Sequence, residues 1–94
     1  MKIITVECKA KSEKRMEVID LCKAMLEPSR AEAGCISYHF YQEITDENAF
    51  FFYEEWKDQA AIDYHIATEH YREFQLKFRT LLQEDAVVRI HSVD

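Results

Sequence analysis

The stretch Phe50–Phe74, FFFYEEWKDQAAIDYHIATEHYREF, contains most of the aromatic residues of the chain, its single Trp and two of its four His. The first seven residues of the stretch form an aromatic run of strand length. Asp58 follows, a residue type that favours the N-cap of a helix, and apolar residues then recur at helical spacing. The stretch therefore predicts a strand, a turn and a second helix that is interrupted near residues 67–68.

On the N-terminal side, residues 2–10 alternate between apolar and polar positions, as in a strand with one apolar face. Ser12 is a candidate N-cap for the helix that follows. The apolar stripe of that helix contains Met16, Ile19, Cys22 and Leu26. Pro28 suits the first turn of a short helical extension over residues 28–33, and Gly34 ends it.

Residues 35–44 and 49–56 alternate as two strands joined by the polar turn 45–48, and residues 85–93 alternate as a last strand. The resulting order, β-α-β-β-α-β, predicts a ferredoxin-like α+β fold: a four-stranded antiparallel sheet with helices on one face. A chain of 94 residues is the size of one domain, so we expect a single domain over 1–94.

The third strand carries aromatic residues on both of its faces, with Phe52 and Trp56 on one side and Phe51 and Tyr53 on the other. A sheet with one solvated face does not need this pattern. We therefore expect a second copy to cover the open face in a homodimer, with an apolar cavity between each sheet and its cover as the ligand site.

The net charge of −6 argues against nucleic acid or an anionic membrane surface as a partner, because both select clusters of Lys and Arg. The N-terminal apolar run is too short for a signal peptide or a membrane span, which predicts a cytoplasmic protein. The three cysteines have no metal-type spacing, and we expect them to be structural thiols.

Several short motifs occur in an order that resembles the antibiotic biosynthesis monooxygenase (ABM) domain family. They are the run Ala31-Glu32-Ala33-Gly34-Cys35-Ile36-Ser37-Tyr38, then Tyr53-Glu54-Glu55-Trp56, then Ala61 with His65, and then Thr68-Glu69-His70-Tyr71 with Phe74. The resemblance covers nearly the whole chain. It implies a dimeric α+β barrel and, for characterised members, cofactor-free oxidation of quinol-like or polycyclic aromatic substrates by O2.

The haem-degrading relatives of this family use an Asn, a Trp and a haem-ligating His. Those positions correspond to Glu7, His65 and Gln75 in this chain, and none of the three residue types is kept. The resemblance therefore does not imply haem, and we expect no cofactor. It does imply that the side chain at position 65 points into the cavity.

Cofactor-free oxygenation needs a dry pocket and a base that removes a phenolic or enolic proton, so that the anion can pass an electron to O2. His65 suits this role, because a neutral imidazole accepts a proton near pH 6.5. A hydrogen-bonded structural histidine is the alternative. Glu54 shares a strand face with Phe52 and Trp56, where it acts as a second base, orients a histidine, or pairs with Arg72, Arg79 or Arg89.

The remaining candidates shape the pocket. We expect substrate contacts from Phe52, Trp56, His70, Tyr38 and Tyr64, although an aromatic stripe is more often part of the core. We expect no metal site, because His65 and His70 are five residues apart and diverge by about 140° on a continuous helix. Zinc pairs on helices are spaced by three or four residues.

The sequence thus predicts a monooxygenase acting on a quinol-like or phenolic molecule. Two other functions stay open: a non-catalytic dimer module that binds a small apolar ligand, and an isomerase of a small phosphorylated sugar derivative. An isomerase of an anion needs a basic residue such as Arg89 in the cavity. A purely structural dimer has its cavity filled by Phe and Tyr side chains.

Overall fold

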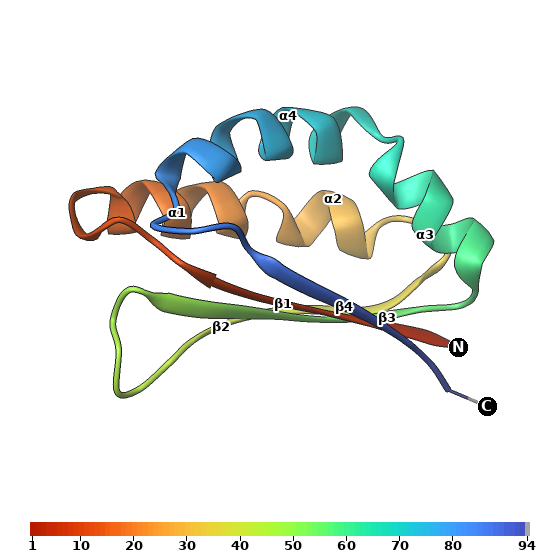
Figure 1. The fold of residues 1–94 in the computed structure, drawn as a ribbon. Helices are drawn as coiled ribbons and strands as arrows, with labels where there is room; N and C mark the ends of the chain where they lie inside the picture. Colours follow the sequence, from red (N-terminus) through yellow and green to blue (C-terminus); the bar gives the residue numbers. More distant parts are fainter. Residues whose placement is uncertain (94) are drawn as a thin grey trace.

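The computed structural model describes residues 1–93 and has the predicted order of elements (Figure 1). Its strands are β1 (Lys2–Lys9), β2 (Cys35–Gln42), β3 (Ala49–Trp56) and β4 (Val87–Ser92). Its α-helices are α1 (Arg15–Lys23), α2 (Leu26–Arg30), α3 (Gln59–Ile66) and α4 (Glu69–Phe78), with 3-10 turns at Ser12–Lys14 and Arg79–Leu81. The ferredoxin-like α+β class is confirmed.

The four strands form one antiparallel sheet in the order β2-β3-β1-β4, and the helices lie in a layer on one face of it (Figure 1). The pairing register places Glu54 of β3 between Ile4 of β1 and Tyr38 of β2. Because side chains alternate along a strand, these three residues share the face that the helices cover. The aromatic stripe of β3 on that face, which includes Phe52 and Trp56, is buried.

The predicted interruption of the second helix is present between Ile66 and Glu69. Asp58 caps α3 as expected, and its carboxylate accepts from the backbone N–H of Ala61 at 2.9 Å. The Thr68 hydroxyl caps α4 and also donates to the carbonyl oxygen of His65 at 2.6 Å. One threonine therefore ends one helix and starts the next, which fixes the angle between them.

Two details of the first helix differ from the prediction. Ser12 lies in a 3-10 turn before α1, and its hydroxyl accepts from the Asn48 side chain at 3.1 Å instead of capping the helix. Met16 is 61% exposed, because the buried side of α1 passes through Val18 and Cys22. The apolar stripe predicted for this helix therefore wrongly included Met16.

The opposite sheet face has no helix on it. Its β3 residues, Phe51 and Tyr53, are half-buried, and Tyr41 and Val87 are exposed. Within residues 1–93, no helix has both the length and the apolar composition required to cross a membrane.

Candidate functional site

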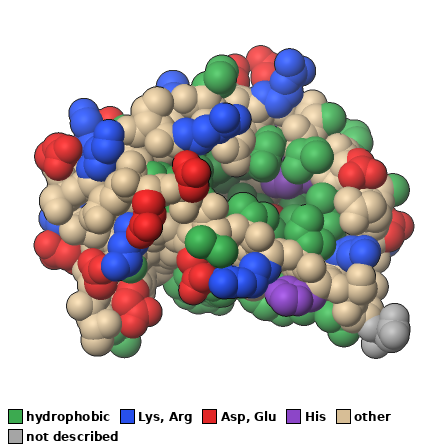
Figure 2. Space-filling view, viewed as in Figure 1, with side chains coloured by type: hydrophobic (Ala, Val, Ile, Leu, Met, Phe, Trp, Pro, Cys, Tyr) green, Lys and Arg blue, Asp and Glu red, His purple; other side chains and the backbone are tan. Residues whose placement is uncertain are grey.

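A cavity of about 530 Å³ lies between the inner face of the sheet and the helices α3 and α4. Most of its lining is apolar and comes from several elements, including Ile4, Val6, Ile62, Phe74, Phe78 and Val88. Figure 2 shows it as a hollow between the helical layer and the sheet, surrounded by hydrophobic side chains and with a histidine inside.

This cavity lies within a single chain, on the helical side of the sheet. The cavity predicted under a covering copy concerns the opposite face, where an open hollow of about 820 Å³ is lined by residues that include Tyr41, Phe51 and Tyr53. The cavity on the helical side exists because the helices do not extend over the edge strand β4. Val88 and Ile90 of β4 face the helical side but are 58% and 50% exposed, so the helical layer leaves the inner face of this edge strand uncovered.

His65, in the last turn of α3, is the most deeply buried polar residue on the cavity wall, with 2% of its surface exposed. The indole of Trp56 lies against the ring, with centroids 4.5 Å apart. Burial lowers the pKa of His65 below its ordinary 6.5, and the neighbouring Glu32 partly opposes this shift. The imidazole is therefore neutral at pH 7 and available as a proton acceptor.

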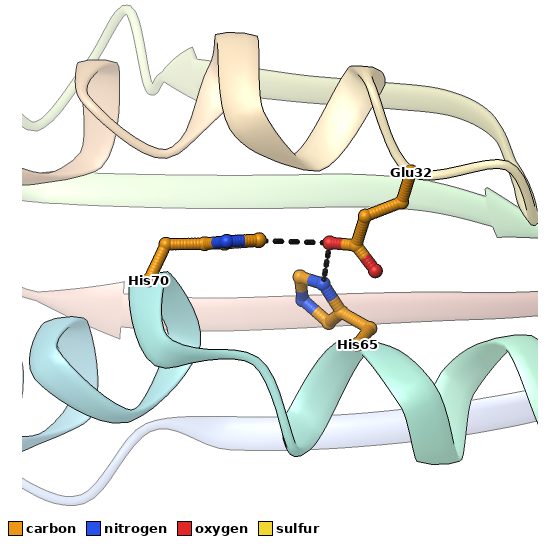
Figure 3. A group of neighbouring side chains, drawn as sticks. All are labelled: Glu32, His65 and His70. Carbon is orange, nitrogen blue, oxygen red and sulfur yellow. Dashed lines mark hydrogen bonds and ion pairs between the residues drawn. The ribbon is translucent and has the colours of Figure 1, made fainter.

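Glu32, in the connection between α2 and β2, holds both histidines (Figure 3). Its Oε2 atom lies 2.6 Å from Nδ1 of His65 and 2.8 Å from Nε2 of His70. Because a carboxylate only accepts hydrogen bonds, it selects the tautomer of His65 with the proton on Nδ1. Nε2 of His65 is then left with its lone pair.

Sequence reasoning assigned no role to Glu32, although the residue lies inside the Ala31–Tyr38 motif run. The contact joins positions 33 residues apart in the chain, so helical or strand spacing gives no sign of it. The available signal was an acidic residue two positions before the only glycine of the sequence, where a turn leads into the second strand.

Glu54 lies on the cavity wall and is 5% exposed. Burial raises the pKa of its carboxyl to about 7, although the Trp56 indole N–H donates to it at 3.0 Å. Among residues 1–93 no arginine of the same chain pairs with Glu54, so the ion-pair alternative has no partner within the chain. The predicted contact between Glu54 and a histidine is also absent, because Glu32 occupies that position.

The other predicted pocket residues divide into two groups. Tyr38 and Phe52 line the cavity together with Glu54 and His65, and their contact with a substrate stays a prediction. Trp56 is fully buried behind His65 and supports the ring instead of lining the cavity.

His70 and Tyr64 lie outside the cavity and line a separate open hollow of about 720 Å³ on the outer surface, beside Gly34. Tyr64 is 67% exposed because it precedes the inward-facing His65 by one residue, which is about 100° of rotation on a helix. The expectation that these two side chains contact a ligand in the cavity does not fit their positions.

Arg89, the residue that would mark an anion site in the cavity, lies on the opposite face of the sheet and pairs with Glu7 at 2.7 Å. The basic residue on the cavity lining is Arg79, which is exposed. The cavity is also open space instead of being filled by aromatic side chains.

Comparisons with known proteins agree with this architecture. The family model described as antibiotic biosynthesis monooxygenase matches residues 1–77. A solved structure described as an antibiotic biosynthesis monooxygenase superimposes with a TM-score of 0.93 at 29% identity, covering 100% of this chain and 99% of the other. The family-model match over residues 1–77 contains Glu54 and all three residues of the Glu32–His65–His70 cluster.

Two sequence relatives are informative. The chain is 35% identical over 87% of its length to YcnE of Bacillus subtilis, whose name provisionally assigns a monooxygenase and of which 86% is covered. It is 41% identical over 97% of its length to sll1783 of Synechocystis. The chain spans 62% of the length of that cyanobacterial relative.

Proposed function

We propose a function on the premise that the chain belongs to the antibiotic biosynthesis monooxygenase family, as the match over residues 1–77 shows. In this proposal the protein is a cofactor-independent monooxygenase that oxidises a quinol-like or phenolic aromatic molecule with O2. The substrate binds in the cavity between the sheet and α3–α4, and His65 is its catalytic base.

The single observation that carries the proposal is a buried histidine on the wall of a mostly apolar cavity, with its Nδ1 atom held by Glu32. Glu32 holds Nδ1 of His65, which leaves Nε2 to accept the phenolic proton of a bound substrate. Aromatic side chains nearby, Tyr38 and Phe52, offer ring contacts for a planar molecule. A cavity of about 530 Å³ suits a ligand of a few fused rings.

The proposed reaction balances without a further reductant. His65 takes a proton from the substrate, and the resulting anion transfers an electron to O2. Carbon–oxygen bond formation gives a hydroperoxide after protonation, and loss of water breaks the O–O bond to leave a carbonyl. A CH2 group or a quinol ring thus supplies four electrons, with one oxygen atom retained in the product and one released as water.

Glu54 has the properties of a second proton carrier in this scheme. Its pKa of about 7 lets the carboxyl exchange between protonated and ionised forms near neutral pH. We assign it the delivery of the proton that converts the peroxide into a leaving group. The competing isomerase function is less well supported, because Arg89 lies on the other sheet face.

The proposal also covers the oligomeric state and the cellular location of the enzyme. We infer a cytoplasmic homodimer that forms through the open sheet face, where Phe51 and Tyr53 remain half-buried in the single chain. Neither nucleic acid nor a membrane is part of the proposal, in line with the net charge of −6.

The test is O2 uptake with a panel of reduced quinones and polycyclic phenols, after subtraction of buffer autoxidation. Wild type is expected to show saturable uptake with at least one compound class. His65→Gln is expected to lose at least about 100-fold in kcat/KM, the range for a general base. The control variant His39→Gln, on the other sheet face, is expected to keep full activity. Uptake equal to the buffer rate for every compound would remove the oxygenase proposal.

A further inference from the structure

We propose that Glu32, His65 and His70 form a binding site for a divalent first-row transition metal ion, of which Zn²⁺ and Co²⁺ are the probes. Two imidazole nitrogens and one carboxylate oxygen converge there, and these three ligand atoms all lie within 4.8 Å of one another. This site shares His65 with the substrate cavity but uses Nδ1 of the ring, and the binding of an ion there does not require that the proposed oxidation occurs.

The interruption between α3 and α4 makes this convergence possible. On a continuous helix, residues 65 and 70 point in directions about 140° apart. The chain leaves the helical path at Ala67 and Thr68, and α4 restarts with His70 turned back toward Glu32 (Figure 3). The ring centroids of the two histidines are 5.9 Å apart.

The donor set is one that binds such ions. Imidazole nitrogen and carboxylate oxygen are the ligands of many zinc sites, with bond lengths of about 2.0–2.2 Å. In tetrahedral geometry this places neighbouring ligand atoms about 3.4 Å apart. The contacts from Glu32 at 2.6 and 2.8 Å are shorter, so a bound ion replaces the bridging protons and lengthens these two contacts by less than about 1 Å.

A second feature of the cluster points to a ligand. Oε1 of Glu32 is buried and has no hydrogen-bond partner among the described residues, although the Glu32 side chain is only 5% exposed. An unpaired carboxylate oxygen in the interior costs free energy. A metal ion beside Oε2 would give this oxygen a partner, as a second ligand atom of the same carboxylate.

The ion has a route into the site. His70 is 26% exposed and lines the outer hollow together with Gly34, Thr68 and Glu69. The ion therefore enters from the outer surface, while the substrate cavity lies on the inner side of His65. A coordinate bond to Nδ1 moves the remaining proton of His65 to Nε2, so an occupied metal site removes the acceptor that faces the cavity.

The test is titration of the metal-free protein with Zn²⁺ by calorimetry and with Co²⁺ by visible d–d absorption. One ion per chain is expected for wild type. His70→Gln is chosen because this residue is partly exposed, so the variant is expected to fold. Its affinity is expected to fall by more than the 10- to 100-fold that loss of an outer-shell partner costs. Glu32→Gln is expected to behave in the same way.

Two controls exclude other ligands. Cys35→Ser removes the half-buried thiol three residues from Glu32, and His39→Gln removes a histidine on the other sheet face; both are expected to bind as wild type. Circular dichroism checks that each variant is folded. No saturable binding by wild type, or binding that survives in folded His70→Gln and Glu32→Gln, overturns the proposal. Because the readout is binding, this result is independent of whether any quinol is oxidised.

Discussion

His65 and Glu54 are the buried titratable groups on the cavity wall, and burial shifts their pKa values in opposite directions. The imidazole is kept neutral because its charged form is the protonated one. The Glu54 carboxyl stays protonated to a higher pH because its charged form is the ionised one. Near neutral pH the cavity wall thus holds one proton acceptor, His65, and one proton donor, Glu54.

The pH dependence of kcat/KM follows from the first shift. A neutral His65 is the active form and is present above its pKa, which lies below 6.5. We predict that the decline on the acid side lies below pH 6.5, where His65 becomes protonated. A decline above pH 7 would come from ionisation of Glu54, the proposed proton donor, and is expected to disappear from kcat/KM only if proton delivery follows the first irreversible step. Glu32 raises the pKa of His65, so Glu32→Gln is expected to move the acid-side decline to still lower pH and to reduce the plateau. An acid-side decline that lies above pH 6.5 in wild type would contradict the assignment.

Glu54 gives a second prediction, on stability. Its folded pKa of about 7 exceeds the ordinary 4.5, so the folded state binds the proton more tightly than the unfolded state. The contribution of Glu54 to the free energy of unfolding is therefore fully present below pH 4.5 and is lost as the pH rises through 7. The shift corresponds to a loss of about 3 kcal/mol.

Urea unfolding at several pH values measures this loss. Glu54→Gln is expected to remove the decrease between pH 4.5 and 8, whereas Glu73→Gln, an exposed change on α4, keeps it. Equal slopes in wild type and Glu54→Gln would refute the raised pKa.

At this scale the sequence identified individual groups better than their partners. His65, Glu54, Tyr38 and Phe52 were predicted and lie together on the cavity wall. Their hydrogen bonds could not be predicted, because the bond from His65 to Glu32 depends on how the α2–β2 connection crosses α3. Tyr64 was misplaced because the rotation of α3 about its axis is set by packing and not by composition.

At the scale of elements, the fold depends on a close approach between the start of β2 and the helix α3. A Cβ atom added at Gly34 would lie 2.4 Å from Cβ of Ala61, well inside van der Waals contact. This approach positions Glu32, two residues earlier, over the end of α3. Glycine is required here by space and not by a left-handed backbone.

We therefore predict that Gly34→Ala destabilises the protein by about 1–3 kcal/mol, the usual cost of overpacking. Ala61→Gly removes the atom that clashes, at a cost of about 1 kcal/mol in helix propensity. The double variant is expected to be more stable than the sum of the two single changes, because they relieve the same contact. Urea unfolding of all four proteins gives the coupling energy, and strict additivity would contradict the packing account.

The boundaries of the elements show which signals were strong. Asp58 and the interruption near Thr68 were predicted correctly, since caps and breaks have local causes. Ser12 was predicted to cap the first helix, but α1 starts at Arg15, and the Ser12 hydroxyl accepts from Asn48 on a distant loop. This hydrogen bond joins two distant parts of the chain, so the local sequence could not show it.

At the scale of the molecule, the order of elements and the sheet topology followed from periodicity alone. The location of the cavity did not, because it depends on how far the helical layer extends over β4. Val88 and Ile90 remain half exposed on that edge strand. The open face of the sheet, with Tyr41 and Val87 exposed, is the surface that the proposed dimer would cover.

The dimer is tested by sedimentation equilibrium. Wild type is expected to sediment as two copies at micromolar concentration. Phe51→Lys places a charge on the open face and is expected to yield monomers, because burying a charge in an apolar interface is costly. Leu76→Lys, an equivalent change on the outer side of α4, is the control and is expected to stay dimeric. A wild-type protein that is monomeric at all concentrations would rule out this interface.

The central claim is that the substrate hydroxyl meets His65 in the cavity between the sheet and α3–α4. The most direct measurement is a crystal structure, determined without oxygen, of the protein with a quinol that it oxidises. We predict that the quinol ring lies against Tyr38 and Phe52, with its hydroxyl oxygen about 2.6–3.2 Å from Nε2 of His65. A quinol bound on the open sheet face, or one in the cavity with its hydroxyl directed away from His65, would contradict the claim.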